Sequence, residues 1–287
     1  MTILRTNSEG LIPQEQSQEI VQSVVKGSAV MSLSRLEEMT TSKKTISVAE
    51  GVTAFYADEA EAIGVANDAK FRPVELQAKK LAVIVPFSNE FLGESIVDVV
   101  AELQTQIIEQ FHRKFDAEAL AGTVYAKNLM GVINASGNKV AEGATAGQAL
   151  YEDVSDVMAL VEDGGYDVNG FITHFGFKNR IRKMKDSNGN AMYLPKGVAG
   201  EQDEFYSQPI GYSFGVDKAT TQLVTGDFSH SVVGIQGEMR FKLLDQATVG
   251  GINLAEKDMS ALRVILPVAY VITKDDAFAA LTPKAQA

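Results

Sequence analysis

The clearest apolar pattern in the chain lies between residues 95 and 121. Apolar side chains recur there at spacings of three and four, which places them on one face of a helix: Ile96, Val100, Leu103, Ile107, Phe111 and Phe115. Polar side chains at the same spacing predict a solvent-facing side: Asp98, Glu102, Thr105, Glu109, His112 and Asp116. Ser95, with Asp98 three residues later, predicts the helix start, and Gly122 predicts its end. At 1.5 Å per residue the helix would be about 40 Å long.

A two-stranded ribbon with a charged tip is predicted before this helix, over residues 43–86. Alternating β-branched or aromatic and polar residues predict strands at Thr45 to Val48, Thr53 to Tyr56 and Arg72 to Val85. Residues 57–71 between them are acidic and rich in small side chains. An isolated hairpin is marginal in water and its edges invite pairing, so the ribbon must rest on another surface. Because the long helix is committed to the body, we expect that surface to be a neighbouring subunit.

Weaker patterns predict the remaining elements and the fold class. Helices are predicted at 14–26, 148–162 and 175–185, with a final helical turn at 277–281; strands are predicted at 168–173, 210–216, 230–244 and 262–273, and a loop at 123–145. Within the last strand, Pro267 predicts an edge position or a bulge. A helix-rich middle followed by antiparallel strands indicates an α+β protein.

Composition narrows the classes of protein that the chain can belong to. Its 287 residues are 45% hydrophobic, which is typical of a globular protein. The absence of cysteine excludes disulfides and thiolate metal sites and fits a reducing cytoplasm. The first residues show no signal pattern, and the longest apolar run, Leu81 to Phe87, is far too short to span a membrane. A net charge of −11 argues against general affinity for nucleic-acid phosphates.

One segment departs from this acidic balance. Residues 176–200 carry six cations against Asp186 alone: Lys178, Arg180, Arg182, Lys183, Lys185 and Lys196. Two interpretations stay open, a solvated helix face or a patch that faces a polyanion or an acidic neighbour.

Candidate catalytic and metal patterns are weak. Gly211-Tyr212-Ser213-Phe214-Gly215 fits the G-x-S-x-G formula of serine hydrolases, but the residues after it make a poor helix and only His230 follows. The three histidines (His112, His174 and His230) are dispersed. Asp186, Asn188 and Asn190 start like a calcium loop, yet Ala191 and Gly197 replace its required glycine and glutamate. We therefore predict no catalytic, cofactor-binding or metal-binding residues and no enzymatic activity.

The order of several segments carries a family resemblance. They are Gly10 to Pro13 before a helix, the ribbon 43–86, the strand-to-helix entry Leu76 to Asn89, the helix exit Asp116 to Thr123, Gly131-Val132, Val168 to Asn190, Gly226 to Ser229 and Leu262 to Leu281. Together they resemble, in order and spacing, the major capsid proteins of tailed bacteriophages with the Hong Kong 97-type fold.

The resemblance implies a domain organisation. Residues 1–42 correspond to an N-terminal arm with a short helix, and 43–86 to an extended β-ribbon loop. Residues 87–145 correspond to a peripheral domain with a long spine helix, 146–228 to an axial domain, and 229–287 to late peripheral strands and the C-terminus.

The resemblance also implies function and partners. We expect self-assembly into hexamers and pentamers of an icosahedral shell around double-stranded DNA, without sequence readout, in a virion assembled in the host cytoplasm. A portal is an implied partner. Because the chain begins at the arm, a separate scaffolding protein, or none, is implied as well. No membrane partner or cofactor is expected. The residues predicted to contact neighbouring subunits are Asp58, Glu59, Glu61, Lys70 and Arg72.

Three alternatives stay open at this point. An encapsulin-type nanocompartment shares the fold and encloses protein cargo. A serine hydrolase would use Ser213, and a monomeric binding module would not assemble. Cross-linking between subunits is not predicted, since nothing in the spacing supports the only candidates, Lys70 and Asn253.

Overall fold

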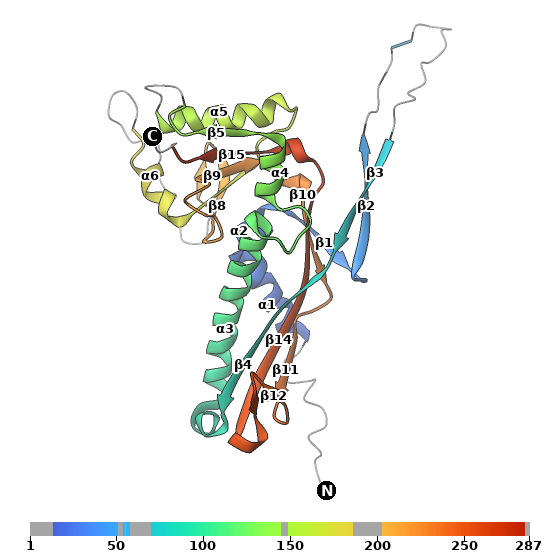
Figure 1. The fold of residues 1–287 in the computed structure, drawn as a ribbon, viewed down its shortest axis with the longest axis vertical. Coiled ribbons are helices and arrows are strands. Elements are labelled where there is room, and N and C mark those ends of the chain that lie inside the picture. Colours follow the sequence, from blue (N-terminus) through green and yellow to red (C-terminus); the bar gives the residue numbers. More distant parts are fainter. Residues whose placement is uncertain are drawn as a thin grey trace.

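The computed structural model describes residues 14–50, 54, 56–57, 70–144, 149–185 and 203–284, with side chains throughout except at 14–20 and 91–102. In these ranges the strands form a five-stranded sheet, a six-stranded sheet and two two-stranded pairs. Figure 1 shows the two large sheets at opposite ends of an elongated molecule. A long helix, α3 (Asn89–Ala121), runs beside the five-stranded sheet, and a two-stranded ribbon projects from the side of the body away from this helix.

The long helix, α3, runs from Asn89 to Ala121 and ends at Gly122, as predicted. It begins earlier than predicted, because Ser88 and not Ser95 is its N-cap. Asn89 donates to the carboxylate of Asp258 (2.6 Å) and accepts from the hydroxyl of Ser260 (2.6 Å). Contacts with a distant strand, which local spacing does not reveal, therefore fix the first turn.

The apolar stripe of α3 faces the core, as its spacing predicts. Ile107, Phe111 and Phe115 are buried, and Leu103 packs against the same cluster. Val24 of helix α1 (Gln14–Gly27) also belongs to this cluster. The predicted polar side is wrong at one position, since Asp116 is buried.

The five-stranded sheet is built around one long strand, β14 (Met259–Ile272). Along one edge β14 pairs with β4 (Lys79–Ser88) over ten residues. Along the other edge it pairs first with β11 (Arg240–Leu244) and then with β10 (Ser231–Gln236). Strand β10 also pairs with β1 (Arg35–Met39). The predicted strand 230–244 is therefore two strands.

Pro267 lies inside this central strand. No bulge occurs there, because the pairing with β4 continues through it, but on its other side the strand is locally at an edge, as one half of the expectation has it. The pairing with β11 ends at Ile265 and the pairing with β10 begins at Val268. Pro267 thus lies in the gap between two neighbours, where its missing N–H removes no hydrogen bond on that edge.

The six-stranded sheet has the order β5-β15-β9-β6-β8-β7. Its strands are Lys139–Ala141, Phe278–Thr282, Leu223–Gly226, Gly170–Thr173, Gln208–Tyr212 and Glu204–Phe205, in that order. Helix α5 (Leu150–Asp163) packs on it through Val154, Val157 and Val161. The predicted final helical turn is wrong, because a short, fully buried apolar run fits a strand as well as a helix. The predicted domain boundaries divide this sheet, since β15 lies in the range 229–287.

Short elements account for the other differences from prediction. The predicted loop 123–145 contains helix α4 (Leu129–Ser136) as well as β5. The predicted helix 175–185 is a 3₁₀ turn, η2 (Phe175–Phe177), followed by helix α6 (Lys178–Arg182). The remaining short elements are α2 (Ala29–Leu33), β12 (Thr248–Val249), β13 (Ile252–Asn253) and the 3₁₀ turns η3 (Phe228–His230), η4 (Ala255–Lys257) and η5 (Asp275–Ala277).

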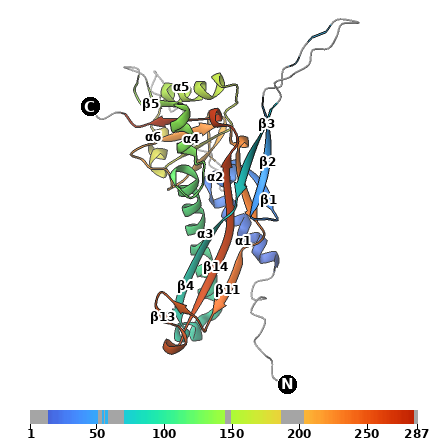
Figure 2. The same ribbon diagram turned by 45° about the vertical axis from the view of Figure 1, so that its right-hand side comes forward.

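The ribbon consists of β2 (Lys43–Glu50) and β3 (Lys70–Gln77), paired antiparallel over eight residues. The predicted strand 72–85 is two strands, separated at Ala78. Figure 2 shows the ribbon leaving the body at the side opposite to α5 and α6. The predicted strand 53–56 lies partly outside the described residues, and Ala54 and Tyr56 are in no strand.

The base of the ribbon packs on the chain's own body. Val74 and Leu76 are buried with Val232 and Val271 of the five-stranded sheet, and Ile46 packs against them. The expectation that the ribbon rests on a neighbour is therefore wrong for its base, because Val74 and Leu76, two positions apart on one face of β3, both reach this cluster.

Candidate assembly surfaces

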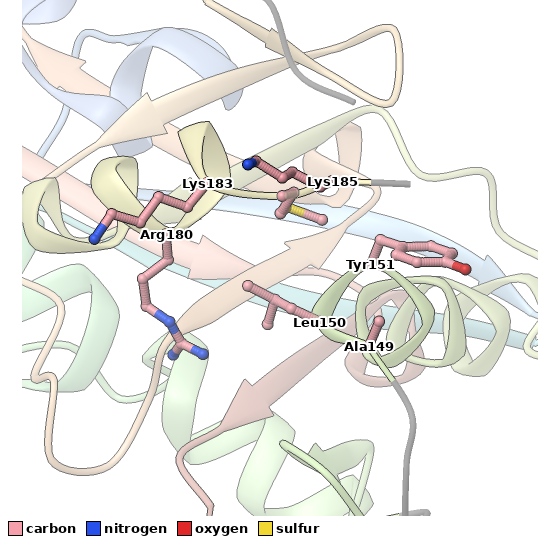
Figure 3. A pocket seen from close by; sticks show the side chains of 7 residues that line it. Ala149, Leu150, Tyr151, Arg180, Lys183 and Lys185 are labelled. Carbon is pink, nitrogen blue, oxygen red and sulfur yellow. The ribbon is translucent and has the colours of Figure 1, made fainter. Parts of the chain in front are cut away.

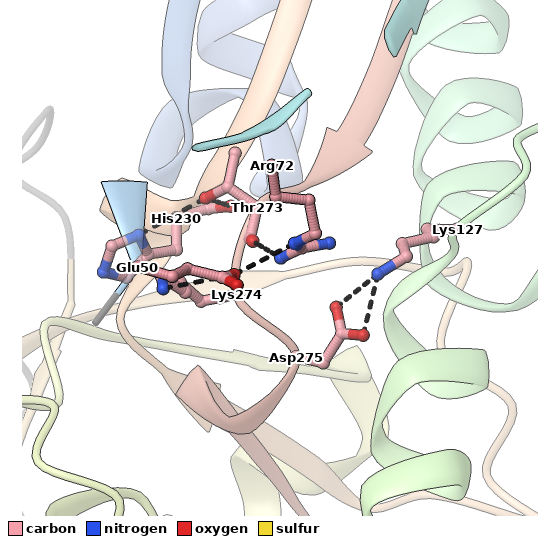
Figure 4. A network of polar contacts seen from close by, with 7 residues as sticks. All are labelled: Glu50, Arg72, Lys127, His230, Thr273, Lys274 and Asp275. Carbon is pink, nitrogen blue, oxygen red and sulfur yellow. Dashed lines mark hydrogen bonds and ion pairs between the residues drawn. The ribbon is translucent and has the colours of Figure 1, made fainter. Parts of the chain in front are cut away.

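A polar network fixes the ribbon base to the segment that joins the two large sheets (Figure 4). Arg72 donates from Nε to Glu50 Oε1 (3.0 Å) and from Nη2 to the carbonyl oxygen of Thr273 (2.6 Å). Lys274 Nζ lies 3.6 Å from Glu50 Oε1. Hydrogen bonding from Arg72 lowers the pKa of the Glu50 carboxyl, so the acid stays ionised beside both cations.

The same joining segment is also held from the side of α4. Lys127 Nζ lies 2.6 Å and 2.7 Å from the two carboxylate oxygens of Asp275. The Thr273 hydroxyl donates to the carbonyl oxygen of His230 (3.0 Å). The orientation of the ribbon is therefore linked to the passage from β14 to β15.

The residues predicted to contact neighbouring subunits are placed differently by the structure. Lys70 is exposed at the start of β3, opposite Glu50. Arg72 lies two positions further and bonds within its own chain. Asp58, Glu59 and Glu61 lie outside the described residues. A role for these residues between subunits stays a prediction.

Asp116 forms a buried junction that the sequence pattern misses. Its carboxylate accepts from the hydroxyl of Ser28 (2.5 Å) and from the backbone amides of Ala29 (3.1 Å) and Val30 (3.3 Å), and Ser213 donates to it as well. Burial raises the pKa of this carboxyl, against the lowering effect of these hydrogen bonds. One signal of its burial is Leu120, four residues later on the same side of α3 and itself fully buried.

Ser213 serves this junction and does not form a catalytic triad. It is buried, donates to Asp116 and accepts from the amide of Gly215 (3.0 Å). A Cβ at Gly211 would lie 2.8 Å from that of Ala29, and one at Gly215 would lie 2.6 Å from the amide nitrogen of Ala117. The glycines of the G-x-S-x-G match therefore allow close approach of the chain to α2 and α3.

The histidines do not supply the missing base or a metal site. His230 Nε2 lies 3.6 Å from Asp227 Oδ2, and His174 Nδ1 accepts from the amide of Gly176 (2.8 Å). Within the described ranges no group of three or more His, Asp or Glu side chains is arranged to hold a metal ion. The residues of the calcium-like segment 186–197 lie outside those ranges.

The basic stretch lines an open pocket of about 320 Å³ between α5 and α6 (Figure 3). The lining residues are Ala149, Leu150, Tyr151, Arg180, Lys183, Met184 and Lys185. Arg180 is paired with Glu142, and Lys178 Nζ lies 2.6 Å from Asp203 Oδ2. Much of the positive charge is thus neutralised within the subunit, while Arg182, Lys183 and Lys185 are exposed. Lys196 and Asp186 lie outside the described residues.

No helix in the described part of the chain is both long enough and apolar enough to cross a bilayer.

Comparison with known proteins gives consistent matches over nearly the whole chain. The chain is 27% identical over 293 residues to the major capsid protein of Staphylococcus phage 80alpha, covering 98% of this chain and 87% of that protein. A solved structure from Microbacterium phage Oxtober96 superimposes with a TM-score of 0.72 at 27% identity, covering 99% of this chain and 96% of that one. One from Mycobacterium phage Adephagia, at 20% identity, has a TM-score of 0.73 with full coverage of both chains and supports the fold alone.

The model of the phage capsid family matches residues 9–282, up to the last residue of β15. The chain therefore belongs to the phage capsid family, as its resemblance to tailed-phage capsid proteins predicts.

Proposed function

We propose that this chain is the major capsid protein of a tailed phage and that it assembles into hexamers and pentamers of an icosahedral shell. The observation that carries the proposal is the family match over residues 9–282, which includes the ribbon and both large sheets. The mechanism is assembly without turnover, in agreement with the packing role of Ser213.

The shape of the subunit supports assembly through its ribbon. β2 and β3 project from one flank, while Val74, Leu76 and the Arg72 network hold their base. Because their base is fixed, the paired strands β2 and β3 project in a defined direction, which suits a contact repeated around a ring.

We propose double-stranded DNA as the shell's content, held by confinement and not by base readout. The net charge of −11 agrees with a wall that does not bind phosphates strongly. A portal and a separate scaffolding protein are proposed as assembly partners, and the virion, built in the host cytoplasm, as the location.

Particle formation by the purified protein tests the proposal. We expect light scattering to report megadalton particles and negative-stain microscopy to show closed shells. Particles from infected or producing cells should contain nuclease-protected DNA. A stable 31 kDa monomer under all conditions would contradict shell formation, and shells that enclose a single enzyme would instead identify an encapsulin.

A further inference from the structure

Two aromatic side chains stack on the surface where the six-stranded sheet meets α3. Phe175 is 45% exposed and Phe214 is 53% exposed, and their ring centroids are 4.5 Å apart in a stacked arrangement. The ring centroid of Tyr212 lies 5.7 Å from that of Phe175. Large apolar side chains that are both adjacent and exposed mark interaction sites more often than isolated ones do.

Cations surround these rings. The guanidinium carbon of Arg113 lies 4.7 Å from the ring centroid of Phe214, and Lys178 Nζ lies 4.6 Å from that of Tyr212. His174 meets Phe214 edge-on at 5.6 Å. We call Arg113, His174, Phe175, Lys178 and Phe214 the aromatic patch. Aromatic rings combined with arginine are typical of the energetic centres of protein interfaces.

The aromatic patch is preformed. The His174 side chain caps η2, which carries Phe175, and Phe214 directly follows the buried Ser213. A surface held in its contact geometry loses little conformational freedom on binding, which favours affinity.

The ribbon, on the opposite flank, offers complementary features. Phe71 is 72% exposed at the start of β3, and Tyr56 is fully exposed. Between them, residues 57–68 contain four acids and no cation: Asp58, Glu59, Glu61 and Asp68. Figures 1 and 2 both place β2 and β3 on one side of the body and α6, which directly follows η2, on the other.

We propose that the aromatic patch receives the ribbon segment 56–71 of a second copy of this chain. Copies related by rotation about an axis form a closed ring only if one flank of each subunit fits the opposite flank of the next. The ribbon flank supplies exposed aromatics and negative charge. The patch flank supplies exposed aromatics; its own cations Arg113 and Lys178 are paired with Glu109 and Asp203, and exposed positive charge lies beside it, at Arg182 of α6 and at Lys183. This inference rests on the proposed function and adds to it the surface that the ribbon recognises.

Disulfide trapping in assembled particles tests this contact directly. The natural chain has no cysteine, so engineered pairs have no background. Lys70 is exposed beside Phe71, and Asn179 is exposed four residues after Phe175. Co-assembly of a tagged Lys70→Cys chain with an untagged Asn179→Cys chain should give a disulfide-linked dimer on oxidation. A matched control pairs Lys70→Cys with Lys257→Cys, exposed on the far η4 turn.

A second measurement uses the aromatic side chains themselves. Phe175→Ala combined with Phe214→Ala should leave the subunit folded by circular dichroism and lower the shell yield about tenfold or more. Leu243→Ala, an exposed apolar residue on β11, is the matched control and should leave the yield unchanged.

The outcomes separate the two proposals. Dimers in the test pair alone, together with the yield loss, support the inference. The inferred contact is overturned if shells form without the Lys70–Asn179 cross-link, or if the yield stays at the wild-type level after loss of both phenylalanines. In either case the proposal of shell formation still holds. If the wild-type chain forms no shell at all, the proposed function fails, and the inference fails with it.

Discussion

At Asp116 one carboxylate receives hydrogen bonds from two hydroxyl groups and two backbone amides, which come from α2, from the residue before it and from the Ser213 loop. Two segments far apart in sequence, 28–30 and the Ser213 loop, thus meet at one side chain of α3. Buried polar groups are strongly destabilising when left without partners, so each of these donors depends on the acid.

Asp116→Asn replaces one acceptor oxygen with a donor. An amide nitrogen placed towards the N–H of Ala29 would face another donor, so we expect the free energy of unfolding at neutral pH to fall by about 1–3 kcal/mol. Urea unfolding of unassembled subunits measures it. Asp163→Asn, an exposed acid at the end of α5, is the control and should change stability by less than about 0.5 kcal/mol.

The same pair of proteins gives a pH dependence with a defined sign. Because burial raises the pKa of Asp116, the folded state holds this proton more tightly than the unfolded chain does. Its titration therefore adds stability that is fully present below the ordinary Asp pKa of about 3.9 and is lost as the pH rises through the raised value. The stability difference between wild type and Asp116→Asn should shrink over that window. A difference that grows with pH would contradict a raised pKa.

The prediction that Asp116 faces solvent is wrong for a physical reason. Helical spacing places Asp116 with the polar residues, since it reports only the angle around the helix axis. Whether that side of the helix is buried depends on α2 and the Ser213 loop, which reach α3 from distant parts of the chain. Sequence periodicity carries no information about such partners.

At the scale of elements, α3 depends on its apolar stripe. Leu103 packs against the main core cluster, and Leu103→Asp would place a charge there without a partner. We expect the free energy of unfolding to fall by roughly 3 kcal/mol or more, so that no folded subunit is found in the soluble fraction. Gln110→Asp on the exposed side is the matched control and should purify as wild type. Soluble, folded Leu103→Asp protein would show that the stripe is dispensable.

The ribbon base gives an element-scale prediction of a different kind. Arg72→Gln removes the charge that pairs with Glu50 and weakens the bond to the Thr273 carbonyl. Because the pair is largely exposed to solvent, the free energy of unfolding should change little. Amide exchange in β3 and at residues 273–275 should nevertheless speed up.

Comparing amide exchange in free subunits and in assembled shells distinguishes a role of Arg72 within its own chain from a contact with a neighbouring subunit. If it acts within its own chain, exchange rises in both samples; a rise confined to shells would support the predicted contact with a neighbour. Lys70→Gln, for which the described residues show no ion pair, is the control and should leave exchange in free subunits unchanged.

Element boundaries were predictable where local chemistry sets them. Gly122 ends α3 as expected, whereas its start depends on Asp258 and Ser260 of another strand region. Strand β15 shows the same limit, because Phe278 to Leu281 are apolar on both faces and only the six-stranded sheet selects an extended chain.

At the scale of the whole molecule, the ribbon should separate folding from assembly. Deleting residues 60–68, which lie outside the described ranges, leaves β2, β3 and their packed base intact. We expect folded subunits with wild-type thermal stability that assemble badly, as measured by circular dichroism and light scattering. A full-length variant with Asp58, Glu59, Glu61 and Asp68 changed to amides separates the effect of charge from that of length. Normal shells from the deletion variant would contradict a role for the ribbon between subunits.

The family was recognisable from the order of segments, although no single motif was specific. The aromatic patch was not, since Arg113, Phe175 and Phe214 come from three parts of the chain and only the fold brings their side chains together.

The pairing of β14 has a mechanical consequence. Ten consecutive residue pairs join it antiparallel to β4, with hydrogen bonds perpendicular to the strand axis. Tension along this axis would load all those bonds at once, in shear, whereas peeling would break them one after another. A shell wall stretched by internal pressure would therefore resist best where such strands lie along the direction of pull.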